Sequence, residues 1–145
     1  MKVIIGCDAN AVGLKKALIE VLEGKQIEFE DIGVKEGEDI DYPDVAKDLA
    51  LKVQSGEFDR GILVCGTGLG MAICANKIKG IRAAVCHDLY STQRSMLSND
   101  CQVICMGAFV IGISLAQELL KVWLDIERTG GTVKKVAKIE KMEEI

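Results

Sequence analysis

Short strand-like runs alternate regularly with helix-like segments along the chain, and no other feature of the sequence constrains the fold as strongly. The runs are rich in Val, Ile, Leu and Cys, except the second, which alternates apolar and acidic residues as an edge strand does. Strands that alternate with helices form a parallel sheet with helices on both faces. We therefore predict an α/β fold with five parallel strands, at residues 2–6, 27–32, 62–64, 82–86 and 101–106.

The segments between these runs have the apolar spacing and the end signals of helices. Gly24 and the pair Ser55-Gly56 follow apolar stripes and are typical of helix ends, while Pro43 is tolerated in a first turn. We expect helices at residues 12–23, 42–54, 71–78, 90–97 and 113–128, and a last one in the charged tail 132–145. The helix at 113–128 is expected to bury Leu115, Leu119, Val122, Trp123 and Ile126.

Composition and charge argue against several classes of protein. The 145 residues form one domain with a net charge of −4, which gives no basic face for nucleic acid or an anionic membrane. No apolar run reaches the ~20 residues that span a bilayer. Six cysteines without a Cys-x-x-Cys pair, and one histidine, are poor material for a zinc site. The first residues have the pattern of a strand rather than of a signal peptide, so we expect a cytoplasmic protein with reduced thiols.

A glycine-rich loop follows the central strand and holds the most distinctive residues of the chain. Residues 62–64 are buried in pattern, Cys65 follows them, and Gly66, Gly68 and Gly70 come at alternate positions before the next helix. Such a loop presents free amide groups that suit an anion. Cys65 at its mouth has two interpretations: a thiolate of lowered pKa, or a small buried apolar residue.

Polar or glycine-rich residues follow four of the predicted strands. They occupy positions 7–11, 65–70, 87–88 and 107–109. In open parallel sheets, ligands bind outside the carboxyl ends of the strands, so these residues point to a single site. The loop is not a dinucleotide fingerprint, since its third glycine is misplaced and it follows the third strand, and no Gly-Lys-Ser/Thr of a Walker loop is present.

The chemistry that fits a thiolate beside a group of amides is proton abstraction next to a carbonyl. The base takes the proton and the loop amides hold the enolate or enediolate oxygen that results. Thr67 could hydrogen-bond the sulfur and orient it.

An ordered set of motifs extends over nearly the whole chain. It comprises Asp8, Asp41-Tyr42-Pro43-Asp44, Cys65-Gly66-Thr67-Gly68-Leu69-Gly70, Ala75-Asn76-Lys77, Gly80-Ile81-Arg82-Ala83-Ala84, Cys86-His87-Asp88, Asn99-Asp100 and Gly107-Ala108. In this set the chain resembles the type B ribose-5-phosphate isomerase and galactose-6-phosphate isomerase family. The resemblance implies a Rossmann-like three-layer α/β/α sandwich and an aldose–ketose isomerase of phosphorylated sugars. It further implies a reaction without metal or cofactor, and a homodimer, or a tetramer, with shared active sites in which the tail 132–145 packs on a partner subunit.

The resemblance also implies roles for single residues. Cys65 matches the catalytic base that moves a proton between C2 and C1, and Thr67 matches a supporting hydroxyl. The loop that holds the enediolate corresponds to Gly66, Gly68, Leu69 and Gly70, and the positions that contact the sugar correspond to Asp8, Ala9, Tyr42 and Asn99.

The chain departs from the family at positions that handle the sugar ring and the phosphate. Ala9 and Ser98 stand where the family usually has histidines, the second of which opens the sugar ring. Phe109 stands where an arginine is frequent, and residues 132–135 lack a His/Arg cluster. His87 is a replacement acid or phosphate contact, or else a residue that orients Asp88 or the loop. Lys134 and Lys135 reach a phosphate, or else form a solvated face.

We interpret the chain as an isomerase of the ribose 5-phosphate/ribulose 5-phosphate type. The missing ring-opening histidine keeps a tetrose phosphate, which forms no such ring, open as a substrate, and the family also leaves galactose 6-phosphate open. A catalytically silent sugar-phosphate-binding subunit is the alternative of a different class. A thiol redox protein lacks a resolving cysteine nearby in sequence.

Overall fold

Five parallel strands form a single sheet in the order β2-β1-β3-β5-β4. The structure is a computed structural model that describes residues 1–145. Its strands are β1 (Lys2–Cys7), β2 (Glu28–Gly33), β3 (Arg60–Cys65), β4 (Ala83–Val85) and β5 (Val103–Gly107). The predicted five-stranded parallel sheet is therefore confirmed, with the alternating second strand at an edge as expected.

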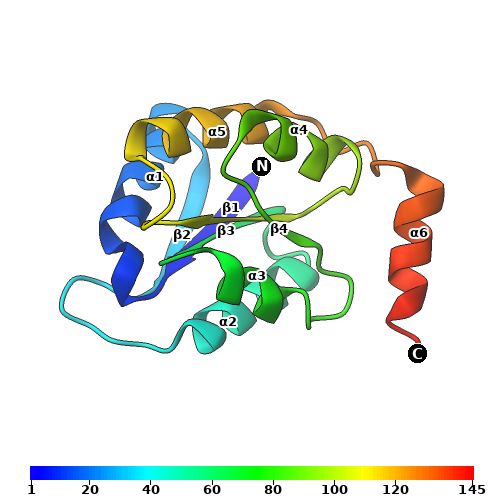
Figure 1. Cartoon of the computed structure of the whole chain (residues 1–145), viewed down its shortest axis with the longest axis horizontal. Helices are drawn as coiled ribbons and strands as arrows, with labels where there is room; N and C mark the ends of the chain where they lie inside the picture. Colours follow the sequence, from blue (N-terminus) through cyan, green and yellow to red (C-terminus); the bar gives the residue numbers. More distant parts are fainter.

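Helices cover both faces of the sheet, which makes the three-layer sandwich that the sequence predicts. In Figure 1, α1 (Val12–Gly24), α4 (Leu89–Leu97) and α5 (Ile113–Asp125) lie on one face, and α2 (Tyr42–Gln54) and α3 (Leu69–Ala75) lie on the other. A short 3-10 turn, Ala9–Ala11, links β1 to α1. The last helix, α6 (Val133–Met142), stands apart at one end of the molecule. None of these helices is long and apolar enough to cross a membrane.

The core consists of two apolar clusters, one on each side of the sheet. Successive side chains of a strand point to opposite faces. Ile62 and Val64 of β3 accordingly pack with α1 and α5, whereas Leu63 and Cys65 pack with α2 and α3. The alternation therefore brings Cys65 to the layer of α3, which spans Leu69–Ala75 instead of the expected 71–78 and so begins inside the glycine-rich segment.

The main local errors of the sequence prediction fall in α5. The helix buries Ala116, Leu120 and Leu124 beside the expected Leu119 and Trp123, while Leu115 is exposed. It ends at Asp125 rather than at residue 128 because Ile126 takes an extended conformation. The guanidinium of Arg60 lies below this end and donates to the carbonyl of Trp123 at 2.6 Å. A cation at a helix carboxyl end binds the free carbonyls there, and periodicity alone does not reveal such a stop.

Candidate active site

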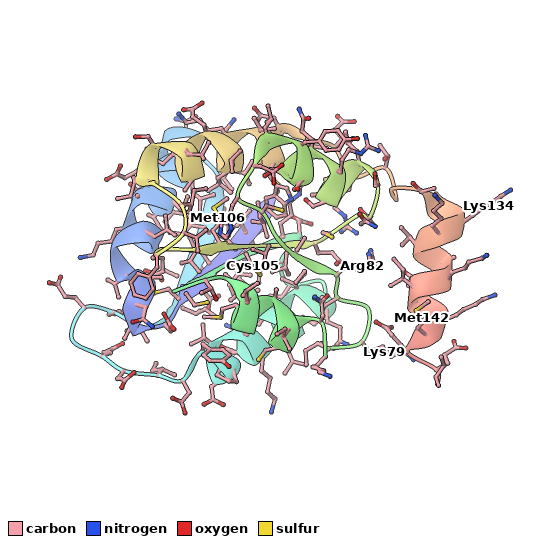
Figure 2. All side chains as sticks on the ribbon, in the orientation of Figure 1. Lys79, Arg82, Cys105, Met106, Lys134 and Met142 are labelled. Carbon is pink, nitrogen blue, oxygen red and sulfur yellow. The ribbon has the colours of Figure 1, made fainter.

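The loop between β3 and α3 is built by close packing of backbone on backbone. Gly68 has a φ of +77°, a conformation that disfavours any side chain, and a Cβ atom there would lie 3.0 Å from the backbone of Met106. Gly107, at the end of β5, lies directly against the loop, and its missing side chain leaves room for Thr67. A Cβ atom on Gly107 would lie 2.5 Å from the Cα atom of Thr67. The glycines thus let the loop rest directly on β5, whose Cys105 and Met106 lie at the centre of the sheet in Figure 2.

The sulfur of Cys65 is held by a backbone amide. Cys65 is the last residue of β3 and 5% exposed, and the Gly68 N–H donates to its Sγ at 3.0 Å. The sequence suggested Thr67 as the partner of the sulfur, but Thr67 Oγ1 instead accepts from the Leu69 amide at 3.2 Å. The hydroxyl proton of Thr67 can therefore be donated to another oxygen.

Cys65 opens into a cavity of about 310 Å³ at the carboxyl ends of the strands, called the carboxyl edge of the sheet below. Four connections meet there, as the rule for parallel sheets predicts. The lining consists of Asp8, Asn10, Tyr42, Cys65, Gly66, Thr67, Gly70 and Phe109. Among the candidate residues from the sequence, the structure thus brings together Asp8, Tyr42, Cys65, Thr67, Gly66 and Gly70.

Asp8 is fixed beside the cavity by the start of the β1–α1 connection. Its backbone N–H donates to the Val64 carbonyl at 3.3 Å, which ties it to β3. Its Oδ1 accepts from the Asn10 amide at 3.0 Å and caps the 3-10 turn. Ala9 is exposed and offers only a methyl group. The sequence prediction missed Asn10, although its place two residues after Asp8 in the same connection could have revealed it.

Two aromatic rings form walls of the cavity because glycines let them approach. A Cβ on Gly70 would lie 2.6 Å from the ring of Tyr42, and one on Gly66 would lie 2.9 Å from the ring of Phe109. Phe109 is 74% exposed, so its ring stands at the rim rather than in the core. Where the sequence comparison with the family pointed to a lost arginine, the structure therefore shows an apolar rim. Leu69 is exposed next to this loop.

His87 lies near the loop but does not line the cavity. Its Nε2 accepts a hydrogen bond of 2.8 Å from the Gly107 amide. Burial lowers the pKa of this imidazole, and the nearby Asp88 carboxylate opposes that shift. His87 is consequently a neutral acceptor that contacts the backbone at the end of β5.

The other candidate residues lie at the amino ends of the strands, called the amino edge of the sheet below. Arg82 precedes β4 and its Nε donates to the Asn99 carbonyl at 2.9 Å, which places Asn99 at the amino edge. The Thr132 amide donates to the Ser98 carbonyl at 2.9 Å, so α6 begins at that edge too. Lys134 points away from the body of the molecule in Figure 2, and Lys135 is exposed on the same helix. Within one chain, Asn99, Lys134 and Lys135 therefore lie far from the Cys65 cavity.

The fold and the site together define a class of protein. The site offers a thiol that accepts from a backbone amide, a hydroxyl that keeps its proton and a glycine-rich loop, all at the wall of one small cavity, and this set suits proton transfer on a small molecule with a carbonyl group. No group of three or more His, Cys, Asp or Glu side chains is placed to hold a metal ion. The geometry is that of an enzyme which shifts a proton between neighbouring carbons.

Comparison with known proteins identifies the family. Residues 3–142 match the family described as Ribose/Galactose Isomerase. The chain is 53% identical to a ribose-5-P isomerase B of Listeria innocua, over 100% of this chain and 97% of the relative. It is 48% identical to a D-erythrulose-4-phosphate isomerase of Pectobacterium atrosepticum, over 96% and 93%. A solved ribose-5-phosphate isomerase B of Clostridium thermocellum superimposes with a TM-score of 0.95 at 41% identity, covering 99% and 98%. The chain belongs to the ribose/galactose isomerase family and is an aldose–ketose isomerase.

Proposed function

We propose that the protein interconverts ribose 5-phosphate and ribulose 5-phosphate through an enediolate, with Cys65 as the base. The thiolate removes the proton from C2 of the aldose, and the carbonyl oxygen O1 takes up the negative charge. The hydroxyl proton of O2 then passes to O1, and the Cys65 thiol returns the first proton to C1, which leaves the carbonyl at C2. The observation that carries this proposal is the Gly68 N–H donating to Cys65 Sγ at the wall of a cavity. The whole-length identity to the Listeria relative supports the pentose phosphate as substrate.

The remaining cavity residues have supporting roles in this proposal. Thr67 keeps its hydroxyl proton because its oxygen accepts from the Leu69 amide, so it can donate to a substrate oxygen. In this proposal the enediolate charge is stabilised by the amides of the glycine loop other than those of Gly68 and Leu69, which already donate to Cys65 and Thr67. Asp8 and Tyr42 face the same cavity and contact sugar hydroxyls.

The proposal includes a homodimer in which two chains share each active site. The chain places Asn99, Lys134 and Lys135 at the sheet edge away from Cys65, so only a second copy can bring them to the cavity. The cavity lining itself has no Lys or Arg side chain to balance a phosphate. We place the enzyme in the cytoplasm, where its six free cysteines stay reduced.

One observation favours a second candidate substrate, a tetrose phosphate such as erythrulose 4-phosphate. The single histidine of the chain is engaged with the Gly107 amide and does not line the cavity, and Ser98 replaces the family's ring-opening histidine. A tetrose phosphate needs no ring opening because its phosphate occupies the oxygen that would close the ring. The Pectobacterium relative carries a name of this kind.

A substrate panel tests the proposal. Ribose 5-phosphate, tetrose phosphates and galactose 6-phosphate are compared by kcat/KM, with Cys65→Ala as the matched variant. We expect the highest value with ribose 5-phosphate and a loss of at least about 10³-fold in the variant, because a general base is removed. A higher value with a tetrose phosphate selects the second candidate. If wild type and Cys65→Ala are equally inactive on every sugar, the chain is a binding subunit and the proposal is wrong.

A further inference from the structure

His87 is the only imidazole in the chain, and it is bound to the backbone beside the catalytic loop. Its Nε2 accepts from the Gly107 amide at 2.8 Å. Because a backbone N–H can only donate, Nε2 must carry a lone pair. The contact therefore exists only with a neutral ring, whose proton is on Nδ1.

The imidazole adds one hydrogen bond to β5 beyond the end of the neighbouring edge strand, β4, which ends at Val85. The last backbone bond between these strands is the Cys86 N–H to the Cys105 carbonyl, at 3.0 Å. Two residues further along β5, the Gly107 N–H points the same way and meets a side chain instead of a carbonyl. His87 thus replaces the missing acceptor of β4 at the point where β5 leaves the sheet.

The backbone amides of the two residues after Gly107 donate to carbonyls of Cys65 and of the loop that follows it. The Ala108 N–H donates to the Cys65 carbonyl at 2.8 Å, and the Phe109 N–H donates to the Gly66 carbonyl at 3.0 Å. Three successive amides are therefore fixed, the first by His87 and the others by the strand end and the loop. A displacement of Gly107 moves both of its neighbours on the loop.

Gly107 also supports the loop by direct contact. The position of its absent Cβ lies 2.5 Å from the Cα atom of Thr67, so no gap separates the two backbones. Thr67 is followed by Gly68, whose amide donates to the Cys65 sulfur. A continuous path of hydrogen bonds and contacts thus joins His87 to the Cys65 sulfur without His87 touching the cavity.

We propose that His87 is a positioning residue. Its neutral imidazole fixes Gly107, and Gly107 in turn fixes the position of the loop 66–68 relative to the end of β5, so that the Gly68 amide keeps its hydrogen bond to the Cys65 sulfur. This inference rests on the proposed role of Cys65 but not on the identity of the sugar. Asp88, at the start of α4, is the charged group that acts on the imidazole. No charged side chain of β5 or of the loop does so.

The test compares His87→Ala, which removes the acceptor, with His87→Gln, whose amide oxygen can accept at the position of Nε2. Asp88→Ala is the matched control: it removes the carboxylate that caps α4 by accepting from the Ser91 amide at 2.7 Å, and it leaves the Gly107 contact in place. The first measurement is the rate of Cys65 alkylation by iodoacetamide as a function of pH. Mass spectrometry of the Cys65 peptide separates this thiol from Cys74, and the measurement needs no substrate.

For His87→Ala we expect the midpoint of Cys65 alkylation to move to higher pH and kcat at pH 8 to fall about tenfold, with KM within about twofold. His87→Gln should restore the wild-type alkylation midpoint and most of kcat, and Asp88→Ala should lower Tm while leaving both unchanged. The proposal is overturned if folded His87→Ala keeps the wild-type midpoint, or if folded His87→Gln is as impaired as His87→Ala. A shifted midpoint in a protein that turns over no sugar would support the positioning role and contradict the proposed function alone.

Discussion

The two edges of the sheet differ in how they are built and in what chemistry they offer. At the carboxyl edge, glycines bring backbone onto backbone around Cys65, and the cavity contains a thiol, hydroxyls and one carboxylate but no cation. At the amino edge, the buried carboxylate of Asp100 binds Arg82 and Arg128 at 3.0 and 2.7 Å, and these three side chains brace the segment that presents Asn99. Each edge holds what the other lacks, which is the arrangement expected if two copies meet edge to edge.

The largest expected effect tests whether the edges cooperate between chains. Cys65→Ala and Asn99→Ala are co-expressed with different affinity tags, and dimers that carry both tags are purified. Each variant alone should lose activity, by at least about 10³-fold for Cys65→Ala. In the mixed dimer one site receives an intact residue from each chain, so we expect about half of the wild-type turnover per dimer. Mixed dimers as inactive as a doubly tagged Cys65→Ala dimer would refute shared sites.

A second variant isolates the amino edge. Asp100→Ala leaves two guanidinium groups without their shared carboxylate, and breaking a buried ion pair costs about 3–5 kcal/mol of unfolding free energy. We expect a matching drop in stability, measured by urea denaturation, while the rate of Cys65 alkylation in the folded variant stays as in wild type. Lys121→Ala removes an exposed pair with Glu118 and is the control, with an expected loss below about 1 kcal/mol. An altered alkylation rate in Asp100→Ala would show that the edges are coupled within one chain.

The comparison also explains which parts of the site the sequence could predict. The β3–α3 loop was predictable because its signals are local: a buried run, then Cys65, alternating glycines and a helix. The rule for parallel sheets then placed Asp8 on the same edge, whereas Tyr42 was assigned to the site only by the resemblance to the family. The contact of His87 with Gly107 joins residues twenty positions apart and leaves no periodic trace. Asn99 is assigned to the site only by the resemblance to the family, although its place just before the strand predicted at 101–106 already puts it at the amino ends of the parallel strands.

A third variant tests the close packing at the carboxyl edge. A Cβ on Gly70 would lie 2.6 Å from the ring of Tyr42, so Gly70→Ala must displace this ring from its place in the cavity wall. Displacing a positioning group costs up to about 10²-fold in rate, so we expect a clear loss in kcat/KM with little change in Tm. Gly13→Ala, where a Cβ meets nothing within 4 Å, is the control. In the double variant Gly70→Ala/Tyr42→Leu the smaller leucine leaves room for the added methyl group. Its kcat/KM should therefore be no lower than that of Tyr42→Leu alone. A further loss would place the damage in the loop instead.

The smallest expected effect separates the edges by pH. Burial lowers the pKa of His87 below its unfolded value near 6.5, so the stability it contributes is present above that pH and is lost as pH falls through the folded pKa. For Asp100, burial acts to raise the pKa but Arg128 and Arg82 outweigh it and hold the pKa low, so its contribution is present above about pH 3.9 and is lost only in stronger acid. Between pH 7.5 and 5, Tm of the wild type should fall by less than about 4 °C, and His87→Gln should remove most of this fall. If Tm of His87→Gln falls as much as that of the wild type, the change belongs to other groups. If replacing Asp100 by Asn alters the change in Tm between pH 7.5 and 5, the assignment of this pH range to the carboxyl edge is wrong.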